Sequence, residues 1–383
     1  MTTPASSHDS PSPHDATGPW GSEPGSHRAV RIADPGDLIS AVPALLGFHP
    51  RRSLVAICLT GTSVGAVMRH DLVLEDPGLM ELVIERFAAV CARDGANRVL
   101  VVMLDDRIGP GAAAVDLPRH RDLVARFRMR LGAAGIELAG AHIAPAVAAG
   151  LEWFALERGD RGVLPDPAAS EVAAAHVFGG RAIRGSREEL EAVLEPCAEH
   201  ERALVAELID EARETGARGR LRVAAVDPVG SDRAALEGVL CRIAQVESGD
   251  ELSAHEYAEL ALALENPTVR DALLALSVGS HADAADQMWI LLGRSLPEPE
   301  CAEALALLGF SAYLRGDGPM AGVALCAALA ADPCHGLANL LDDALQTGVR
   351  PTALRDLADV GFGVAAALGV SLPNPEPLPP GGV

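Results

Sequence analysis

The chain contains no lysine, and this absence excludes several classes of chemistry. The lysine of the P-loop, the Schiff-base lysine of pyridoxal enzymes and the strand lysine of protein kinases all act through a primary ammonium. Arginine does not reproduce the charge or the pKa of that group. We therefore exclude P-loop nucleotidases, pyridoxal enzymes and protein kinases.

Aromatic residues are also scarce, at 3% of the chain, so the side chains on which bases or sugars stack are in short supply. The 31 basic residues, all arginine, stand against 53 acidic residues and leave a formal charge of −22. Such an acidic field repels phosphate backbones and anionic lipids. We expect neither nucleic acid nor a membrane surface as a partner.

The seven cysteines include no C-x-x-C pair, and no apolar run reaches the length of a membrane span. Residues 1–27 lack the apolar core of a signal peptide, and their Ser, Pro, His, Gly and Asp content predicts a disordered leader. The histidines show no H-E-x-x-H spacing, so we expect no zinc site. Together these features predict a soluble, cytoplasmic protein with reduced cysteines.

Strand and helix patterns alternate from Arg28 to about Leu156. Apolar runs or period-two alternation predict strands, and apolar residues at helical spacing predict helices. The expected strands are 29–33, 53–60, 64–74, 97–104, 136–143 and 152–156, and the expected helices are 35–46, 77–93 and 117–131. A short Gly/Thr/Ser link between 53–60 and 64–74 predicts an antiparallel hairpin. Strands separated by helices predict a mixed, mostly parallel sheet that is covered by helices.

Beyond Pro165 the strand patterns nearly stop. Ser186 and Glu189 form a capping box, and a long helix is expected from Glu199 to Thr215, ended by Gly216. Residues 221–226 are expected to form one last strand. From Ser231 onward the pattern is helical, which predicts a helical bundle or an array of hairpins. The expected domains are a leader at 1–27, an α/β domain at 28–226 with a helical extension from about 166, an all-helical domain at 231–372, and a Pro-rich tail at 373–383.

Two motifs match known catalytic or nucleotide-binding patterns only in part. Gly61-Thr-Ser63-Val-Gly65 has the form G-x-S-x-G, but a nucleophile elbow must lead into a helix and this segment leads into a strand pattern. We expect a hairpin loop. Residues 109–114 read as G-x-G-x-x-A, but they begin four residues after the strand, and Asp105 and Asp106 would repel a pyrophosphate. We expect no nucleotide there.

The most site-like residues are Asp105 and Asp106, which follow a predicted central strand. Open α/β sheets bind ligands at the carboxyl ends of strands, and paired carboxylates are suited to Mg²⁺. The same pair also suits a helix or turn cap. His49 lies between a helix and a strand, and Asp71 lies on the second strand of the expected hairpin. Both are further candidate ligand-binding residues at the sheet edge, although a structural turn explains His49 and a surface ion pair explains Asp71 as well.

Part of the helical half resembles a single tetratricopeptide unit. Leu308-Gly309, Ala321, Leu325, Ala328 and Pro333 stand at the spacings of that repeat, where small residues mark the contact between two helices. Shifting by 34 residues in either direction loses the pattern, so no array follows. An ordinary antiparallel helix hairpin accounts for the same residues.

Three segments together resemble the actinobacterial domain-of-unknown-function 4192 family. They are the run from Asp34 to Val55, which contains Leu-Leu-Gly-Phe-His-Pro, then Arg69-His-Asp-Leu72, and the distant run from Tyr313 to Pro333. The resemblance covers about Arg28 to Leu354 and implies that both halves form one unit. It implies no activity, catalytic residue or cofactor.

Two functions remain open at this point. One is the binding of a small ligand or Mg²⁺ at the strand ends, by Asp105, Asp106, Asp71 and His49. The other is a non-enzymatic scaffold or regulatory protein that binds a protein partner through its helical half. The sequence leaves open whether the chain is an enzyme, which residues would be catalytic and which cofactor it would use.

Overall fold

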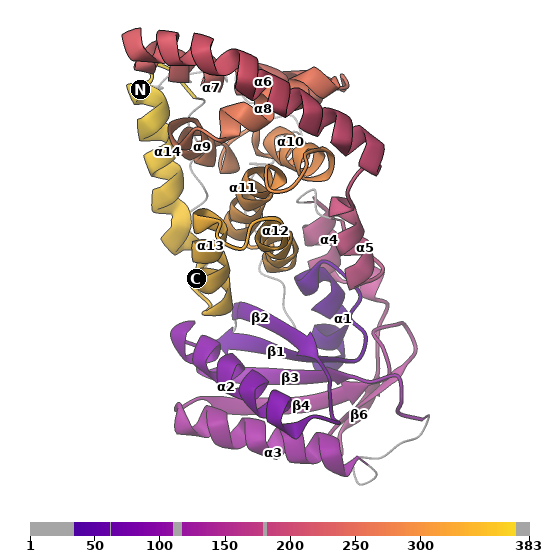
Figure 1. The fold of residues 1–383 in the computed structure, drawn as a ribbon. Helices are drawn as coiled ribbons and strands as arrows, with labels where there is room; N and C mark the ends of the chain where they lie inside the picture. The colour runs from indigo at the N-terminus through magenta and orange to yellow at the C-terminus, as the bar shows by residue number, and fades with distance from the viewer. Residues whose placement is uncertain (1–33, 62, 110–116, 179–181, 373–383) are drawn as a thin grey trace, which may run out of the picture.

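The computed structural model describes residues 34–61, 63–109, 117–178 and 182–372. The predicted strand at 29–33 and most of the G-x-G-x-x-A segment lie outside these residues. The first half of the described chain folds as an α/β unit with one six-stranded sheet, shown at the bottom of Figure 1. Its elements are α1 (Pro35–Leu46), β1 (Ser53–Thr60), β2 (Ser63–Asp71), α2 (Pro77–Arg93), β3 (Arg98–Leu104), α3 (Pro118–Ala133), β4 (Glu137–Ala144), β5 (Glu152–Ala155) and β6 (Arg161–Val163).

The sheet is mixed, with the strand order β2-β1-β3-β4-β5-β6. Among the described strands only β3 and β4 pair in parallel, and the other neighbouring strands are antiparallel. The predicted mixed sheet is confirmed, but its mostly parallel character is wrong. A helix that connects two strands makes them run in the same direction, but it does not determine whether they are neighbours in the sheet. Here β2 and β3 run in the same direction on either side of β1.

The β1–β2 hairpin confirms the loop that was expected in place of a nucleophile elbow. Thr60 pairs with Ser63, and Gly61 adopts a φ of 61°, a left-handed conformation that glycine takes without steric strain. Ser63 opens the strand β2 instead of a helix. The strained turn that would expose a serine nucleophile is therefore absent at this position.

Helices cover the two faces of the sheet differently. One face packs against α2 and α3, where Phe87 and Phe127 meet edge to face at 6.2 Å between ring centroids. Full burial of such a side chain stabilises the fold by about 1.5–3 kcal/mol. On the other face, Val55 and Val102 pack with α1 in an apolar cluster that continues into the helical half. Figure 1 shows α2 and α3 in front of the sheet and the helical half above it.

The rest of the described chain is helical, as predicted. It comprises η2 (Pro167–Ala169), α4 (Glu171–Phe178), α5 (Arg187–Glu191), η3 (Ala192–Leu194), α6 (Glu199–Val226), α7 (Pro228–Glu247), α8 (Ala254–Leu264), α9 (Pro267–Leu273), η4 (Leu274–Ser277), α10 (Ala282–Ser295), α11 (Cys301–Leu314), α12 (Gly318–Ala331), α13 (Gly336–Gln346), η5 (Pro351–Leu354) and α14 (Arg355–Ala367). The helices α11 and α12 lie side by side. A Cβ atom on Gly309 would lie 2.8 Å from Leu325, so the glycine allows the close approach.

One prediction in this half is wrong. The helix α6 continues through Gly216 to Val226, and no strand forms at 221–226. A short apolar run does not distinguish a strand from a helical segment, and a glycine inside a helix costs only about 1 kcal/mol. No described helix is both long and apolar enough to span a membrane.

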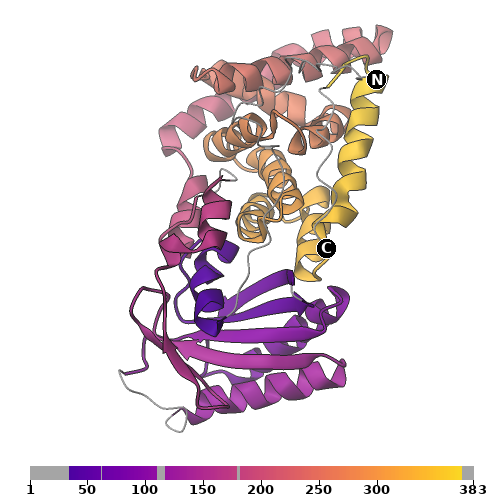
Figure 2. The same ribbon diagram turned by 180° about the vertical axis from the view of Figure 1, so that it is seen from behind.

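The two halves are joined at the C-terminal ends of α2 and α13, which approach each other in Figure 2. Arg86 Nε donates to the carbonyl of Gln346 at 3.3 Å, and Arg93 donates to the carbonyl of Thr347. In return, Arg350 donates to the carbonyl of Asp94, at the end of α2. The last carbonyl groups of a helix have no hydrogen-bond partner within the helix. Arginines from each half thus donate to such carbonyl groups at a helix end of the other half.

Candidate functional site

Asp105 lies at the carboxyl end of β3 and is almost completely buried. Its Oδ1 accepts hydrogen bonds from the backbone N–H of Arg107 at 3.1 Å and from Arg107 Nε at 2.7 Å. Its Oδ2 lies 3.1 Å from Arg107 Nη2 and 2.9 Å from Nε2 of His120, a buried residue in the first turn of α3. Arg107 also pairs with Glu75 at 2.9 Å. Both carboxylate oxygens are therefore occupied by donors.

These contacts set the protonation state of Asp105. Burial by itself raises the pKa of a carboxyl group, but the hydrogen bonds from Arg107 and His120 outweigh burial and lower the pKa of Asp105. The carboxylate is therefore charged, and it ties the end of β3 to the beginning of α3. This arrangement positions α3 with respect to the sheet.

The four predicted site residues share one end of the sheet but do not meet in one pocket. Ser53 pairs with both Asp71 and Leu104, so the side chain of Asp71 lies on the same face as Leu104 and opposite to that of Asp105. On its own face, Asp71 forms an ion pair with Arg69 at 2.5 Å. The alternation of side chains along a strand therefore separates Asp71 from Asp105.

The other two candidates are also engaged elsewhere. Asp106 is exposed and lies 2.7 Å from Nε of Arg52. His49 is half-buried, and its backbone N–H donates to the carbonyl of Arg184 at 3.0 Å. Within the described residues, no group of three or more His, Cys, Asp or Glu side chains is arranged to hold a metal ion.

A cleft with a volume of about 500 Å³ opens beside the Asp105 cluster. It lies between the N-terminal ends of α2 and α3, and it is lined by Leu74, Glu75, Pro77, Met80, Pro118, Arg119, Asp122, Leu123 and Arg126. Both helices begin with a proline at this end of the sheet. Clefts at the carboxyl ends of strands are where α/β sheets commonly bind ligands.

The cleft contains donors without acceptors. The helix α3 has no side-chain cap at its N-terminus within the described residues. Arg121 N–H donates to the carbonyl of Leu117 at 3.1 Å, whereas the N–H groups of Arg119 and His120 have no intrahelical acceptor. Nε of Arg126 is buried and lacks a hydrogen-bond partner among the described residues. Arg126 Nη2 and Asp122 lie 2.9 Å apart, whereas the exposed side chain of Arg119 has no ion pair within the described part of the chain.

Sequence reasoning did not identify His120, Arg107 or Arg119 as members of this site. His120 stands 15 residues after Asp105 on another element, so no local motif links the two. One usable signal was that Pro118 starts the next helix along the chain after the strand that ends just before Asp105.

A family model described as Domain of unknown function (DUF4192) matches residues 35–352. The chain belongs to this family. The predicted resemblance to the domain-of-unknown-function family is thereby confirmed, whereas its actinobacterial origin stays a prediction. The DUF4192 match spans both the sheet and most of the helical half. No curated protein and no solved structure matches the chain.

The segment on which the resemblance rested has a structural place in this DUF4192 chain. Phe48 forms a parallel bridge with Arg184, and the backbone N–H of Arg184 donates to the carbonyl of Gly47 at 2.8 Å. Arg69 lies over the ring of Phe48, 6.0 Å from its centroid. The Leu-Leu-Gly-Phe-His-Pro segment therefore links the start of the sheet to the connection that leads into α5.

Proposed function

We propose that this protein binds a small anionic ligand in the cleft between the N-terminal ends of α2 and α3. The single observation that carries the proposal is the N-terminus of α3, which lines the same cleft as Arg119 and Arg126. Within the described residues this N-terminus has no side-chain cap and Nε of Arg126 has no partner. Helix N-termini attract anions through their free N–H groups and the helix dipole. Leu74, Met80 and Leu123 add an apolar wall for the body of the ligand.

The local charge supports an anion in spite of the charge of −22 on the whole chain. The 16 residues of α3 contain five arginines. Those at 126, 128 and 130 form ion pairs with acidic side chains, whereas those at 119 and 121 have none within the described part of the chain. The two acidic residues of the cleft are already paired, Glu75 with Arg107 and Asp122 with Arg126. An anion therefore meets mainly unpaired donors.

The sequence suggested a small ligand or Mg²⁺, and of these Mg²⁺ fits the site less well. Mg²⁺ binds through carboxylate oxygens and water. Both oxygens of Asp105 accept hydrogen bonds, and Asp106 is paired with Arg52. A divalent cation at Asp105 would have to displace Arg107 and His120.

The proposal is tested by thermal denaturation and calorimetry with inorganic phosphate, pyrophosphate, citrate and ATP, each with chelator and with Mg²⁺. A ligand at 100 times its Kd stabilises the folded chain by about 2.7 kcal/mol, which shifts the melting temperature measurably. Stabilisation without Mg²⁺ supports the anion, and stabilisation by Mg²⁺ alone supports the metal. An unchanged melting curve with all of these ligands at about 10 mM overturns the proposal.

A matched pair of variants locates the site. Arg119→Gln removes a cation from the cleft, whereas Arg121→Gln removes an exposed cation of the same helix that does not line it. A hydrogen bond to a charged group contributes about 1.5–3 kcal/mol, so Arg119→Gln should weaken binding about 10- to 100-fold. Equal losses in both variants would show that only the net charge of α3 matters.

A different observation favours a second function. The protein would then be a non-enzymatic scaffold or regulatory protein that binds a protein partner through its helical half. A groove with a volume of about 540 Å³ runs between α12 and the segment α5–η3. The α11–α12 hairpin, which resembles one tetratricopeptide unit, supplies one of its walls. A cytoplasmic location, with neither nucleic acid nor a membrane as partner, remains part of both proposals.

A further inference from the structure

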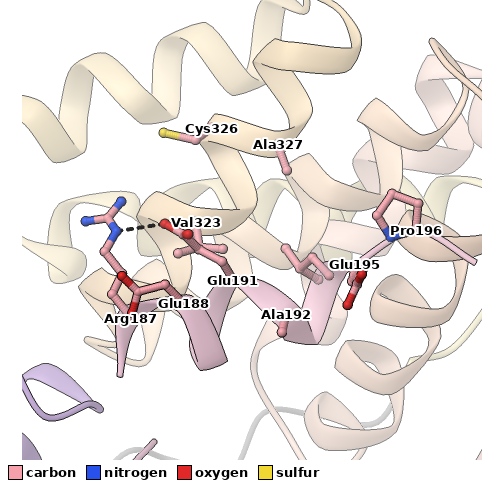
Figure 3. Close-up of a pocket in the computed structure, with 10 residues that line it drawn as sticks. Arg187, Glu188, Glu191, Ala192, Glu195, Pro196, Val323, Cys326 and Ala327 are labelled. Carbon is pink, nitrogen blue, oxygen red and sulfur yellow. Dashed lines mark hydrogen bonds and ion pairs between the residues drawn. The ribbon is translucent and has the colours of Figure 1, made fainter. Parts of the chain in front are cut away.

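The groove beside α12 has two walls from distant parts of the sequence. One wall is the segment from Arg187 to Pro196, which forms α5, η3 and the turn after them. The other is a face of α12 made by Val323, Cys326 and Ala327. Figure 3 shows these residues of α12 across the groove from Glu188 and Glu191.

The floor of the groove is apolar. Leu194 and Val323 are buried at its base, and Ala327 is half-buried beside them. On α12, residues 323, 326 and 327 stand at spacings of three and four, so they share one stripe of the helix. A cavity of about 540 Å³ lies in the usual range for binding pockets, which is about 300–1,000 Å³.

The rim of the groove is acidic. Glu188, Glu191 and Glu195 are exposed along one wall. Arg187 is the only basic residue of the lining, and its Nε already lies 2.8 Å from Oε1 of Glu191. The rim therefore offers at least two carboxylates that no arginine of the lining pairs.

The surroundings of Cys326 in this groove do not activate its thiol as a nucleophile. Burial raises the pKa of its thiol, and the nearby Asp342 raises it further. A thiol with a raised pKa is a poor nucleophile, because the thiolate is the reactive form. The groove is suited to reversible binding.

We infer that this groove binds a short segment of a partner protein in which arginine or lysine side chains flank one or two apolar side chains. The apolar side chains occupy the floor over Leu194 and Val323, and the basic side chains pair with the glutamates of the rim. The inference rests on the second function proposed above and is independent of the anion cleft. The charge of −22 on the chain also favours the approach of a basic partner.

The test is a selection of random 12-residue peptides, displayed on phage, against the full-length chain. Enriched peptides are then synthesised, and their affinities are measured by fluorescence polarisation. We expect a consensus with Arg or Lys beside an apolar residue. Binding should weaken about 10-fold or more in the triple variant Glu188→Gln, Glu191→Gln, Glu195→Gln, and it should lose most of its salt dependence.

The matched control is the triple variant Glu207→Gln, Glu211→Gln, Glu214→Gln, which removes the same charge from exposed positions on α6. It should bind the peptides as the wild type does, and so should Arg119→Gln. Enrichment of acidic or neutral peptides, or of none, overturns the inference. So does an equal loss in both triple variants. Basic peptides that bind the groove variant normally leave the partner function standing and overturn only its place in the groove.

A second copy of the chain is the alternative occupant, and sedimentation velocity decides this point. A dimer that dissociates in the triple variant at positions 188, 191 and 195 would replace the partner segment with a neighbouring copy. A monomer in both the wild type and the variant agrees with the inference.

Discussion

Replacing Asp105 by Asn should destabilise the protein far more than the same change at its neighbour Asp106. The carboxylate of Asp105 accepts charge-assisted hydrogen bonds from Arg107 and His120 while it is almost completely buried. Breaking a buried ion pair typically costs 3–5 kcal/mol, but Arg107 is partly exposed and is able to turn towards water. We therefore expect a loss of about 2–3 kcal/mol in the free energy of unfolding for Asp105→Asn. Asp106 forms an exposed pair with Arg52, so Asp106→Asn should cost less than about 1 kcal/mol.

The pH dependence gives this prediction a second, independent readout. The pKa of Asp105 in the folded chain lies below its ordinary value of 3.8, so the stabilisation is complete above that value. It is lost as the pH falls through the lowered pKa. The gap between wild type and Asp105→Asn should therefore be constant near neutral pH and should shrink below pH 3.8.

Urea denaturation at a series of pH values measures both quantities. Equal stabilities of the wild type and Asp105→Asn at neutral pH would refute the reasoning, because the buried contacts would then contribute nothing. A gap that persists unchanged at acid pH would contradict the assigned protonation state. In the first case Asp105 would not be the residue that fixes α3 to the sheet.

Three further predictions concern positions away from the cleft. A Cβ atom on Gly361 would lie 2.7 Å from the backbone N of Ala275 and 2.9 Å from the carbonyl of Asp271, whereas Gly363 of the same helix has open space around it. Gly361→Ala should therefore destabilise the chain by about 1–3 kcal/mol, and Gly363→Ala should stabilise it by about 0.5–1 kcal/mol; urea midpoints that move in the same direction would contradict this. Burial lowers the pKa of His142 below its ordinary value of 6.5, against the opposing charges of nearby carboxylates, so stability should decrease as the pH falls below 6.5. His142→Gln should flatten that decrease in urea titrations, and an unchanged slope would assign it to other groups. Finally, a maleimide reagent should modify the exposed cysteines of the native chain well before the buried ones, as peptide mass spectrometry would show; equal rates would argue against this packing. The exposed cysteines are Cys241, Cys334 and Cys326, and the buried ones are Cys58, Cys91 and Cys301. Among the exposed ones Cys326 should react most slowly, because the pKa of its thiol is raised.

Local signals in the sequence were sufficient for most element boundaries. Asp34 and Asp76 each precede a proline and cap the helices that follow, and the predicted helix at 77–93 has the same ends in the structure. Ser253 and Glu256 form both hydrogen bonds of a capping box. These contacts join residues two or three positions apart, so the sequence pattern contains them completely.

Such local signals could not predict which strands are neighbours in the sheet, because strand pairing depends on contacts between residues that are distant in the sequence. The sequence did not reveal that β1 lies between β2 and β3, and the mostly parallel sheet was therefore wrong. The candidate site was affected in the same way. Which face carries Asp71 follows from the register of β1 with both neighbours, and this register separates it from Asp105. The sequence thus identified the right end of the sheet but not the group of side chains that occupies it.

The contact between α2 and α13 has a consequence for how this protein tolerates mutation. Arg86, Arg93 and Arg350 bind main-chain carbonyls, and those acceptors persist whichever side chains stand at residues 94, 346 and 347. Substitutions at residues 346 and 347 should therefore leave the attachment intact, whereas loss of an arginine should weaken it. A substitution at residue 94 should also weaken it, because the carboxylate of Asp94 lies 3.5 Å from Nε of Arg350. At residues 346 and 347 each hydrogen bond constrains the arginine but not the side chain of the acceptor residue, so these two positions can change while the arrangement of the two halves is kept.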